Sequence, residues 1–248
     1  ALDDDLLRRR FHEVVIALEV CRHPLTATQV ARVEAYATAL DLTGPDLGML
    51  RDLVDAGTER ATADFHRFLG AHLAERVEPG LGGISPADTP EPELVARLAA
   101  FADLPDGSLG RAYLDFYERH HLTLPGVVAI DMNHFFVAHD MNHVIAGYEP
   151  VAAGELALGA FQMGMNDSEV SWILCLTNLA IHEAGVIQLG DIAPKHETLS
   201  RPGVADMFGR AMARGVATTG DFAAADHLAM ADRPLEEVRA AYGVPPLD

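Results

Sequence analysis

Residues 135–146 read FFVAHDMNHVIA, an apolar stretch that carries two imidazoles and one carboxylate. His139 and His143 are four residues apart, so on a helix the two rings lie on one face, one turn apart. Asp140 follows His139 directly and can lean toward the same point. Such groups among apolar neighbours tend to be buried, and burial is costly unless they are paired or bind a metal. The stretch therefore predicts a buried helix that carries part of a metal site.

A later carboxylate, Glu155, is the fourth candidate ligand. On a straight helix it would lie roughly 18 Å beyond His143, at about 1.5 Å per residue. Residues 147–150 read GYEP, however, and this glycine and proline predict that one helix stops and another starts. An antiparallel hairpin across the break would bring Glu155 back level with His143.

We predict that one divalent ion, with zinc favoured, binds to His139, Asp140, His143 and Glu155. Three or four protein ligands leave room for water or substrate. The alternative is that these residues are ordinary core or surface side chains, since the chain has 12 His in all.

The spacing of these four residues also carries a family resemblance. The pattern H-D-x-x-H, then eleven residues, then E, resembles the signature of the coenzyme Q (ubiquinone) biosynthesis family designated Coq-four. Two further segments occur in the family's order: LPDGSLGRAY at 104–113 is similar to the segment before the motif, and RPLEEVR at 233–239 is similar to the C-terminal one. The resemblance covers roughly residues 75 to 245.

The resemblance implies metal-dependent chemistry on a lipophilic, prenylated aromatic ring. In the family, the proposed reaction removes the carboxylate at ring position C1 and couples this loss to hydroxylation there. At the matching positions, the resemblance implies that the ion is held by His139, Asp140, His143 and Glu155. It also gives the catalytic roles to the carboxylates of Asp140 and Glu155. A related substrate of specialised metabolism, in a decarboxylating, dehydrating or ring-closing step, would use the same Lewis acid. We therefore expect a decarboxylase-, hydroxylase- or cyclase-like enzyme, a lyase in the broad sense.

Two other functions remain open. Family members have also been regarded as scaffolds that bind a lipid intermediate and organise a biosynthetic complex, in which case the metal is structural. A closed shell of four ligands favours that role, whereas an open position with bound water favours catalysis. Metal-dependent hydrolysis would need a general base near a metal-bound water, for which Glu183 is the candidate.

The composition is that of a folded, strongly acidic chain. Of its 248 residues, 49% are hydrophobic, which is enough for a core. The 37 acidic and 18 basic residues give a net charge of -19, which argues against binding nucleic acid or anionic lipid. Cys21 and Cys175 suit a reducing compartment better than a disulfide framework. Because there is no 18-residue apolar run and the start, ALDDD, is not a targeting peptide, we expect a cytoplasmic protein.

Helical periodicity dominates the chain, so we predict an all-α multi-helix bundle. Residues 1–78 form an N-terminal helical region that weakly resembles the tellurite-resistance TerB-like bundle. Residues 79–92 are rich in Gly and Pro and predict a linker. Residues 93–248 then form the Coq-four-like metal-binding domain. Within it we expect a long apolar helix from Ser168 to about Leu189, which serves the core or a homodimer interface.

Local signals predict several helix boundaries. The sequence TATQ at 26–29 fits a capping box at the start of a helix. Ser108 is suited to cap a second helix, and Pro234 to open a short final one. A further helical region is expected from about Asp46 to Glu78.

Other side chains around the motif have two interpretations each. The four methionines nearest to it are Met132, Met141, Met163 and Met165. They favour core filling, or alternatively a pliable cavity for an isoprenoid or aromatic tail. His182 and Glu183 either orient a metal ligand or form a surface pair. His134 could at best orient a ligand, and Arg111 favours a structural ion pair over contact with an acidic substrate. The chain has no P-loop and no G-x-S-x-G elbow, so nucleotide and serine-hydrolase chemistry lack support.

Overall fold

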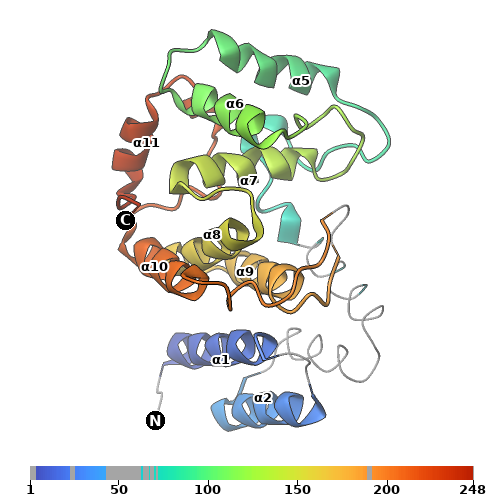
Figure 1. Ribbon diagram of the computed structural model, residues 1–248, viewed down its shortest axis with the longest axis vertical. Helices are drawn as coiled ribbons and strands as arrows, with labels where there is room; N and C mark the ends of the chain where they lie inside the picture. The colour runs from blue at the N-terminus through green and yellow to red at the C-terminus, as the bar shows by residue number, and fades with distance from the viewer. Residues whose placement is uncertain are drawn as a thin grey trace.

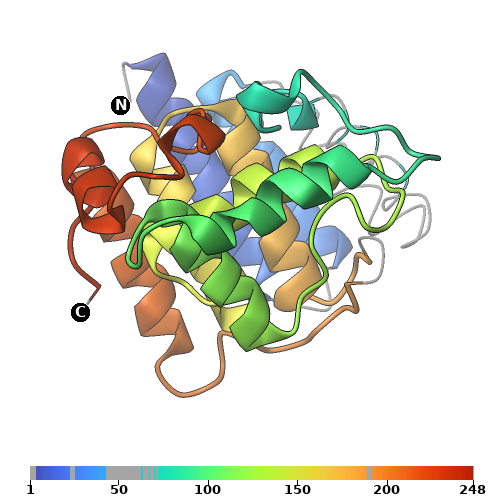
Figure 2. The same cartoon turned by 90° about the horizontal axis from the view of Figure 1, so that it is seen from above.

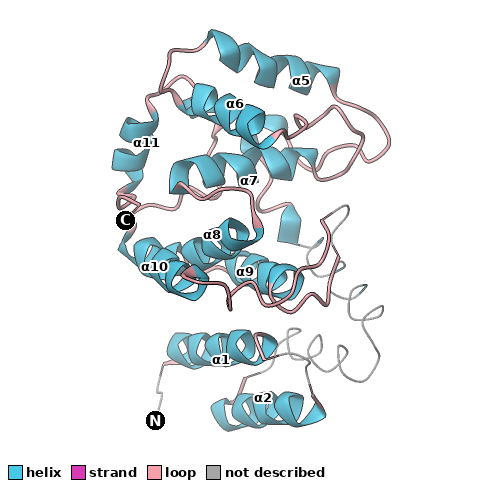
Figure 3. Cartoon of the chain, in the orientation of Figure 1, coloured by secondary structure: helices cyan, strands magenta, loops and turns pink. Residues whose placement is uncertain are grey.

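The computed structural model describes residues 4–22, 26–42, 72–188 and 192–247, together with residues 63, 67 and 70. In this part of the chain every regular element is a helix and no strand is present, which confirms the predicted all-α class (Figure 1, Figure 3). The α-helices are α1 (Asp5–Val20), α2 (Ala27–Leu40), α5 (Pro92–Ala99), α6 (Leu109–His120), α7 (Asn133–Ala146), α8 (Ala152–Met165), α9 (Glu169–His182), α10 (Val204–Ala217) and α11 (Leu235–Tyr242). Short 3-10 turns are η1 (Pro79–Leu81), η2 (Ala100–Asp103) and η3 (Leu228–Met230).

The helices begin at the caps that the sequence indicates. Thr26 and Gln29 form the predicted capping box of α2, with both reciprocal hydrogen bonds present. Ser108 caps α6 by accepting a hydrogen bond from the N–H of Arg111. Pro234 immediately precedes α11. Side-chain oxygens at these positions satisfy N–H groups that a helix leaves unpaired at its start.

The predicted helical region from Asp46 to Glu78 lies largely outside the described residues. Its described end is helical only to Leu73, so the predicted boundary at Glu78 is wrong. A turn follows, in which the N–H groups of Glu75 and Arg76 bond to the carbonyls of His72 and Leu73. The Arg76 side chain then donates to the hydroxyls of Ser168 and Ser171 at the start of α9, which ties this turn to the bundle.

The Gly- and Pro-rich stretch 79–92 lies against the first turn of α7. The N–H of His134 donates to the hydroxyl of Ser85 at 2.7 Å. The two ring nitrogens of His134 lie 2.6 Å from the carbonyl oxygen of Gly83 and 2.6 Å from a carboxylate oxygen of Glu91. The stretch is therefore held by α7 along much of its length, and the division of the chain into two domains stays a prediction.

Two apolar cores meet at helices α7 and α8. One core joins α9 with α1 and α2, and Phe135 and Leu156 belong to it. The other joins α5, α6 and the C-terminal helices, and Met141 and Phe161 belong to that one. Figure 1 shows α5 and α6 on one side of α7 and the group α8 to α10 on its other side, and Figure 2 gives the view from above. The residues of α7 and α8 are therefore set between two packed layers.

Helix α8 packs most closely against α10, and two glycines permit the close approach. A Cβ atom at Gly164 would lie 2.3 Å from the carbonyl oxygen of Met212, and one at Gly215 would lie 2.0 Å from that of Phe161. Both distances are far below van der Waals contact, so any larger residue would force the two helices apart. This packing holds α8, and Glu155 with it, firmly in the bundle.

Helix α9 is shorter than predicted, because it ends at His182 and not near Leu189. Gly185 adopts a positive φ of 63°, and the N–H of Val186 bonds back to the carbonyl of Ala180. This left-handed turn is a common helix stop. The apolar face of α9 packs against α8 and α1 within the chain, so this helix does not leave that face for a homodimer interface. The homodimer itself stays a prediction.

Two further observations concern the predicted environment of the protein. Cys21 and Cys175 are both free thiols. Among the described residues, no helix has the length and apolar character needed to cross a membrane.

Candidate metal centre

The turn between α7 and α8 brings the candidate ligands together. Helix α7 stops at Gly147, which has a positive φ of 85°, and the N–H groups of Gly147 and Tyr148 both bond to the carbonyl of His143. Helix α8 starts at Ala152, and Glu155 lies in its first turn. A carboxylate there also interacts favourably with the helix dipole. The predicted return of Glu155 toward the imidazoles is therefore present.

The two helices do not form the closely packed hairpin that the sequence suggested. Helix α7 lies mainly against α6, whereas α8 lies mainly against α10 and α9, so α7 and α8 contact each other over a short region only. Each helix follows its own apolar core, and the contact between them includes the polar residues of the candidate site.

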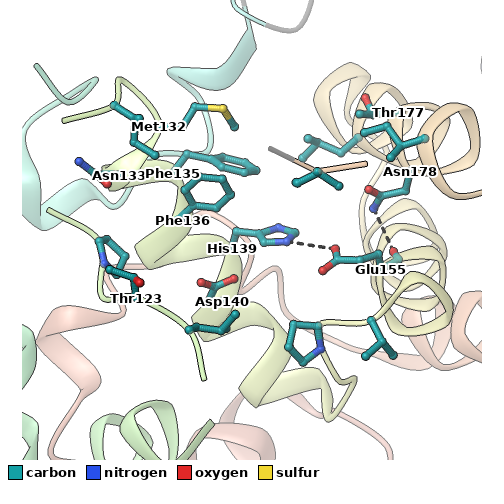
Figure 4. A pocket seen from close by; sticks show the side chains of 18 of the residues that line it. Thr123, Met132, Asn133, Phe135, Phe136, His139, Asp140, Glu155, Thr177 and Asn178 are labelled. Carbon is teal, nitrogen blue, oxygen red and sulfur yellow. Dashed lines mark hydrogen bonds and ion pairs between the residues drawn. The ribbon is translucent and has the colours of Figure 1, made fainter. Parts of the chain in front are cut away.

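Three donor side chains face one another as a triangle, in which Glu155 offers a different carboxylate oxygen to each imidazole. Nε2 of His143 lies 3.2 Å from Nε2 of His139 and 3.2 Å from Oε1 of Glu155. Nε2 of His139 lies 3.3 Å from Oε2 of Glu155. The side chain of His143 is fully buried, and those of His139 and Glu155 are 15% and 17% exposed. Figure 4 shows His139 and Glu155 facing each other from α7 and α8.

These distances fit the requirements of a metal ion. Nitrogen and oxygen ligands about 2.0–2.1 Å from a tetrahedral zinc ion stand about 3.3 Å from one another. Without an ion, two imidazole Nε2 atoms face each other, and the Glu155 carboxylate is the shared hydrogen-bond acceptor of both rings. Two imidazoles and a carboxylate also suit zinc and other borderline divalent ions. The residues present therefore fit the predicted ion, whose binding stays a prediction.

The orientation of both rings is set by their neighbours. Nδ1 of His143 lies 2.9 Å from the carbonyl oxygen of Tyr148, which only accepts, so Nδ1 carries the proton and Nε2 is free to bind a metal. The ring of Phe116 stacks on His143, with centroids 5.8 Å apart. The ring of Phe135 stacks on His139 in the same way at 5.2 Å. These contacts hold the two Nε2 atoms toward Glu155.

Asp140 lies beside the triangle and is tied to Tyr117. One ligand atom from each of His139, Asp140 and His143 lies within 4.8 Å of the others. The hydroxyl of Tyr117 donates to Oδ2 of Asp140. Burial raises the pKa of Asp140, although both imidazoles and Tyr117 act to lower it. Burial and the neighbouring Asp140 charge also raise the pKa of Tyr117 well above its usual value, so its hydroxyl keeps its proton.

The charges of His143 and Glu155 stabilise each other. Burial alone would lower the pKa of His143, but the charge and hydrogen bond of Glu155, together with Asp140, raise it above the usual value. Burial alone would raise the pKa of Glu155, but His143 and His139 hold it well below the usual value. In the metal-free cluster, an ionised Glu155 carboxylate therefore lies beside a protonated His143 imidazole. A divalent cation can take the place of the positive charge on that imidazole.

Two arginines from the C-terminal part of the chain hold the end of α7, and sequence reasoning missed both. Arg214 donates to the carbonyl of Ala146 and to the hydroxyl of Tyr148. Arg239 donates to the carbonyl of Ile145. Cations at the C-terminal end of a helix complement its dipole and satisfy its free carbonyls. No local signal could reveal these contacts, because the partners are distant in sequence.

The cluster opens into a pocket of about 520 Å³, within the range of sites that bind small molecules (Figure 4). The apolar residues of its lining are Leu122, Leu124, Pro125, Val128, Ile130, Met132, Phe135, Phe136, Leu174, Ile181 and Ile192. The polar residues of its lining include Tyr117, His139, Asp140, Glu155, Gln162, Asn178 and His182. His143 does not line the pocket and lies buried behind the other ligands.

The remaining candidate residues divide between the core and the pocket. Met141, Met163 and Met165 pack in the two cores, as the core interpretation predicted. Met132 alone among the four methionines lines the pocket. The predicted structural ion pair of Arg111 is confirmed, with Asp115 at 3.2 Å.

His134, His182 and Glu183, which the sequence suggested as residues that support the metal site, lie in different surroundings. His134 binds the stretch 79–92 and does not reach the cluster. His182 and Glu183 are only 6% and 3% exposed, so a surface pair is wrong. The carboxylate of Glu183 accepts the N–H of Leu199 at 2.6 Å, which binds it to the chain after α9. Glu183 is therefore not placed as a general base for hydrolysis.

Comparison with known proteins adds little. No protein-family model matches the chain, and no curated protein matches it. A crystal structure of a Nostoc punctiforme protein, described provisionally as a ubiquinone biosynthesis protein, is similar at 20% sequence identity and a TM-score of 0.43. The similarity covers 96% of this chain and 99% of that one. A likeness at this level establishes neither family nor function, and the TerB-like character of residues 1–78 also stays a prediction.

Proposed function

We propose that the protein is a metal-dependent enzyme that acts on a lipophilic aromatic substrate. The observation that carries the proposal is the triangle of His139, His143 and Glu155 beside an apolar pocket. Buried titratable groups with shifted pKa values at such a pocket are the usual composition of an active site. A metal with a purely structural role would not need a cavity at its side.

A divalent ion held by three of the four candidate ligands, His139, His143 and Glu155, would supply a Lewis acid for an oxygen of the substrate and would leave Asp140 for proton transfer. The chain itself positions these ligands before any ion binds. The Tyr148 carbonyl keeps His143 in the ligating tautomer, while His139, Asp140 and Glu155 line the pocket. This degree of preorganisation favours catalysis, because little rearrangement is needed when charge develops.

The pocket wall suits an aromatic ring. Phe135 and Phe136 lie next to each other at its edge, with ring centroids 5.7 Å apart, and present flat apolar surfaces. Aromatic rings associate with such surfaces in offset or edge-to-face arrangements. We assign proton transfer at the pocket wall to Asp140, whose pKa is raised by burial and whose carboxylate accepts a hydrogen bond from the Tyr117 hydroxyl.

The reaction that we favour is loss of a carboxylate from an aromatic acid. The ring–carboxylate bond breaks, carbon dioxide leaves, and the ring carbon takes a proton that we assign to Asp140. Hydroxylation of that carbon, as the family resemblance suggests, would in addition need water and dioxygen, with dioxygen acting as a two-electron oxidant that is reduced to hydrogen peroxide. A dehydrating or ring-closing step on a related substrate would use the same groups.

A non-catalytic scaffold is the second candidate, supported by the two carboxylates, Asp140 and Glu155, that each lie close to the imidazole pair. If all four bind the ion, no position is left for substrate, and the pocket would carry an intermediate without changing it. X-ray absorption at the zinc edge distinguishes the two roles. Four protein ligands support the scaffold, and three with a bound water support the enzyme.

Elemental analysis of the purified protein, with mass spectrometry of co-purified small molecules, gives the ion and the ligand class together. The variant Glu155→Gln keeps the shape and removes the charge, so turnover of the substrate so identified should fall by about 100-fold or more, while stability changes little. His121→Asn, which changes an exposed histidine with positive φ, is the control. Undiminished turnover by Glu155→Gln would remove the direct role of that carboxylate.

A further inference from the structure

Two polar side chains, Gln162 and His182, line the pocket, and Nδ1 of His182 is buried without a hydrogen-bond partner among the described residues. Gln162 is 3% exposed and His182 is 6% exposed, so both are removed from bulk solvent. Buried polar groups in proteins nearly always have partners. The incompletely paired imidazole and the buried amide of Gln162 therefore give this cavity a polar side, which a ligand with polar atoms would match.

The pocket-lining part of α9 is a continuous helical stripe. Its residues are Leu174, Thr177, Asn178, Ile181 and His182, which follow the spacing of one helix face. Nδ1 of His182 is sealed in the protein, so Nε2 is the nitrogen that can reach the cavity. The amide of Asn178 donates to the backbone carbonyl of Glu155 at 2.9 Å, which holds α9 in a defined position relative to the metal ligands.

Gln162 extends the polar lining of the pocket along α8, away from the metal ligands. It follows Glu155 by seven residues, so it lies on the same face two turns later, roughly 10 Å along the helix axis. The close approach of α8 to α9 at Gly159 lies between them, where an added Cβ would stand 3.1 Å from Cα of Cys175. The polar atoms of the pocket are thus spread over its length and do not gather at the metal cluster alone.

We propose that Gln162 and His182 bind hydroxyl or carbonyl oxygens on the substrate, at positions away from the group that meets the metal. The substrate class is accordingly a multiply oxygenated aromatic of two or three rings, and not a ring whose remainder is only a hydrocarbon tail. This proposal rests on the proposed function, because it takes one oxygen group of the substrate to be bound at the metal ion. Gln162 and His182 are specificity-determining residues and take no part in holding the ion.

The chemistry of the two side chains selects oxygen groups without charge. A glutamine amide both donates and accepts, which suits a hydroxyl as well as a carbonyl. Burial lowers the pKa of His182, although the charge of Glu155 acts against this, so the ring is neutral near pH 7 and Nε2 offers one hydrogen bond. A bare hydrocarbon here would displace water from both groups and leave them unpaired, which is unfavourable.

The size of the pocket agrees with this class. A volume of about 520 Å³ corresponds to roughly 17 water-sized groups at about 30 Å³ each. Two or three fused rings with their oxygen substituents have this size. A long isoprenoid tail would have to continue beyond the pocket.

The proposal is tested with a matched set of probes that share one chelating group. The parent is 3-hydroxy-2-naphthoic acid, and the comparison compounds are 3,5- and 3,7-dihydroxy-2-naphthoic acid, each with one extra hydroxyl on the far ring. Binding to the zinc-loaded protein is measured by calorimetry. At least one dihydroxy compound should bind about tenfold more tightly than the parent, the effect of one well-formed buried hydrogen bond.

The variants Gln162→Met and His182→Leu should each bind the parent compound as tightly as the unaltered protein does. At least one of the two variants should show a preference for the extra hydroxyl that is about tenfold smaller. Thr177→Val is the matched control, because Thr177 lines the same wall but its hydroxyl is already bonded to the carbonyl of Ile173 at 2.7 Å. Thermal unfolding and zinc content check that each variant folds. Equal binding of all three probes by the unaltered protein, no binding of any of them, or an unchanged preference in both variants would overturn the proposal.

The same titrations on protein treated with a chelator separate this proposal from the proposed function. If no metal binds, or if metal makes no difference to the probes, the metal-dependent function fails. The preference for the extra hydroxyl, measured as a ratio of affinities, depends only on Gln162 and His182 and should persist without the ion.

Discussion

Two histidine–carboxylate clusters each include residues of helix α7, and they differ in how complete their hydrogen bonds are. In the closed cluster (Glu78, Asn142 and His227), Nδ1 of His227 lies 2.8 Å from Glu78 and its Nε2 lies 3.0 Å from Oδ1 of Asn142. The second oxygen of Glu78 accepts the N–H of Leu228. In the open cluster (His139, His143 and Glu155), two Nε2 atoms face each other and share one carboxylate.

The difference shows that burial of titratable groups does not by itself indicate a functional site. Glu78 and His227 are completely buried, yet both ring nitrogens and both carboxylate oxygens have partners and neither residue lines the pocket. In the open cluster the two Nε2 atoms share one carboxylate and can bind a metal ion, and the cluster borders a cavity. Incomplete coordination beside a cavity is therefore the more informative sign, and the following predictions separate the two clusters.

The largest effect is expected from Glu78→Leu in the closed cluster. Removing one partner of a buried pair leaves the other group unpaired, which should lower the free energy of unfolding by about 3–5 kcal/mol. Urea denaturation measures this loss, and zinc content per folded molecule should not change. The exposed neighbour Glu75, changed to Gln, is the control. A loss below about 1 kcal/mol would mean that the closed cluster does not stabilise the fold.

In the open cluster, His143→Ala should lower zinc affinity by more than about 100-fold, because it removes a ligand that is already oriented. Competition with a chromophoric chelator measures the affinity, with His121→Asn as the control. The free energy of unfolding of the metal-free protein should fall less than it does in Glu78→Leu. Zinc affinity equal to that of the unaltered protein would place the ion elsewhere.

A smaller effect is expected from Tyr117→Phe, which removes the hydrogen bond to Asp140. Loss of such an orienting contact should reduce zinc affinity or turnover by about 10- to 100-fold. The control is Tyr242→Phe, because the Tyr242 hydroxyl approaches only the sulfur of Met230, at 3.7 Å. If Tyr117→Phe matches its control in both assays, the Tyr117 hydroxyl does not contribute to metal binding or turnover by orienting Asp140.

The smallest effect is a pH dependence that differs in sign with and without metal. The raised pKa of His143 means that its stabilising contribution is complete below its unfolded value of about 6.5 and is lost as the pH rises through the folded value. Glu155, whose pKa is lowered, loses its contribution only at acid pH, as the pH falls through the folded value.

The measurement follows from these signs. Between pH 6 and 9, the unfolding temperature of chelator-treated protein should contain a component that falls with pH, and this component should disappear in His143→Ala. The additional stabilisation by zinc should instead rise with pH, because the ion requires deprotonated imidazoles. Parallel profiles with and without zinc would show that the ion and the proton do not compete for this cluster.

Much of the fold followed from local features of the chain. The apolar period of FFVAHDMNHVIA predicted α7, and the break at Gly147 predicted the return of Glu155, because helical spacing and glycine turns depend on neighbouring residues. The capping box at Thr26 was correct for the same reason. The end of α9 was misplaced because apolar residues continue past the left-handed turn at Gly185.

The sequence by itself determined the all-α class and the four candidate ligands, since both rest on spacing along single helices. Only the tertiary structure decided which buried histidines are satisfied and which are not. His227 pairs with Glu78, which is distant in sequence, Nδ1 of His182 has no partner among the described residues, and Arg214 reaches the end of α7. Hydrogen-bond completion in a core depends on residues far apart in sequence, whose approach is set by how whole helices pack.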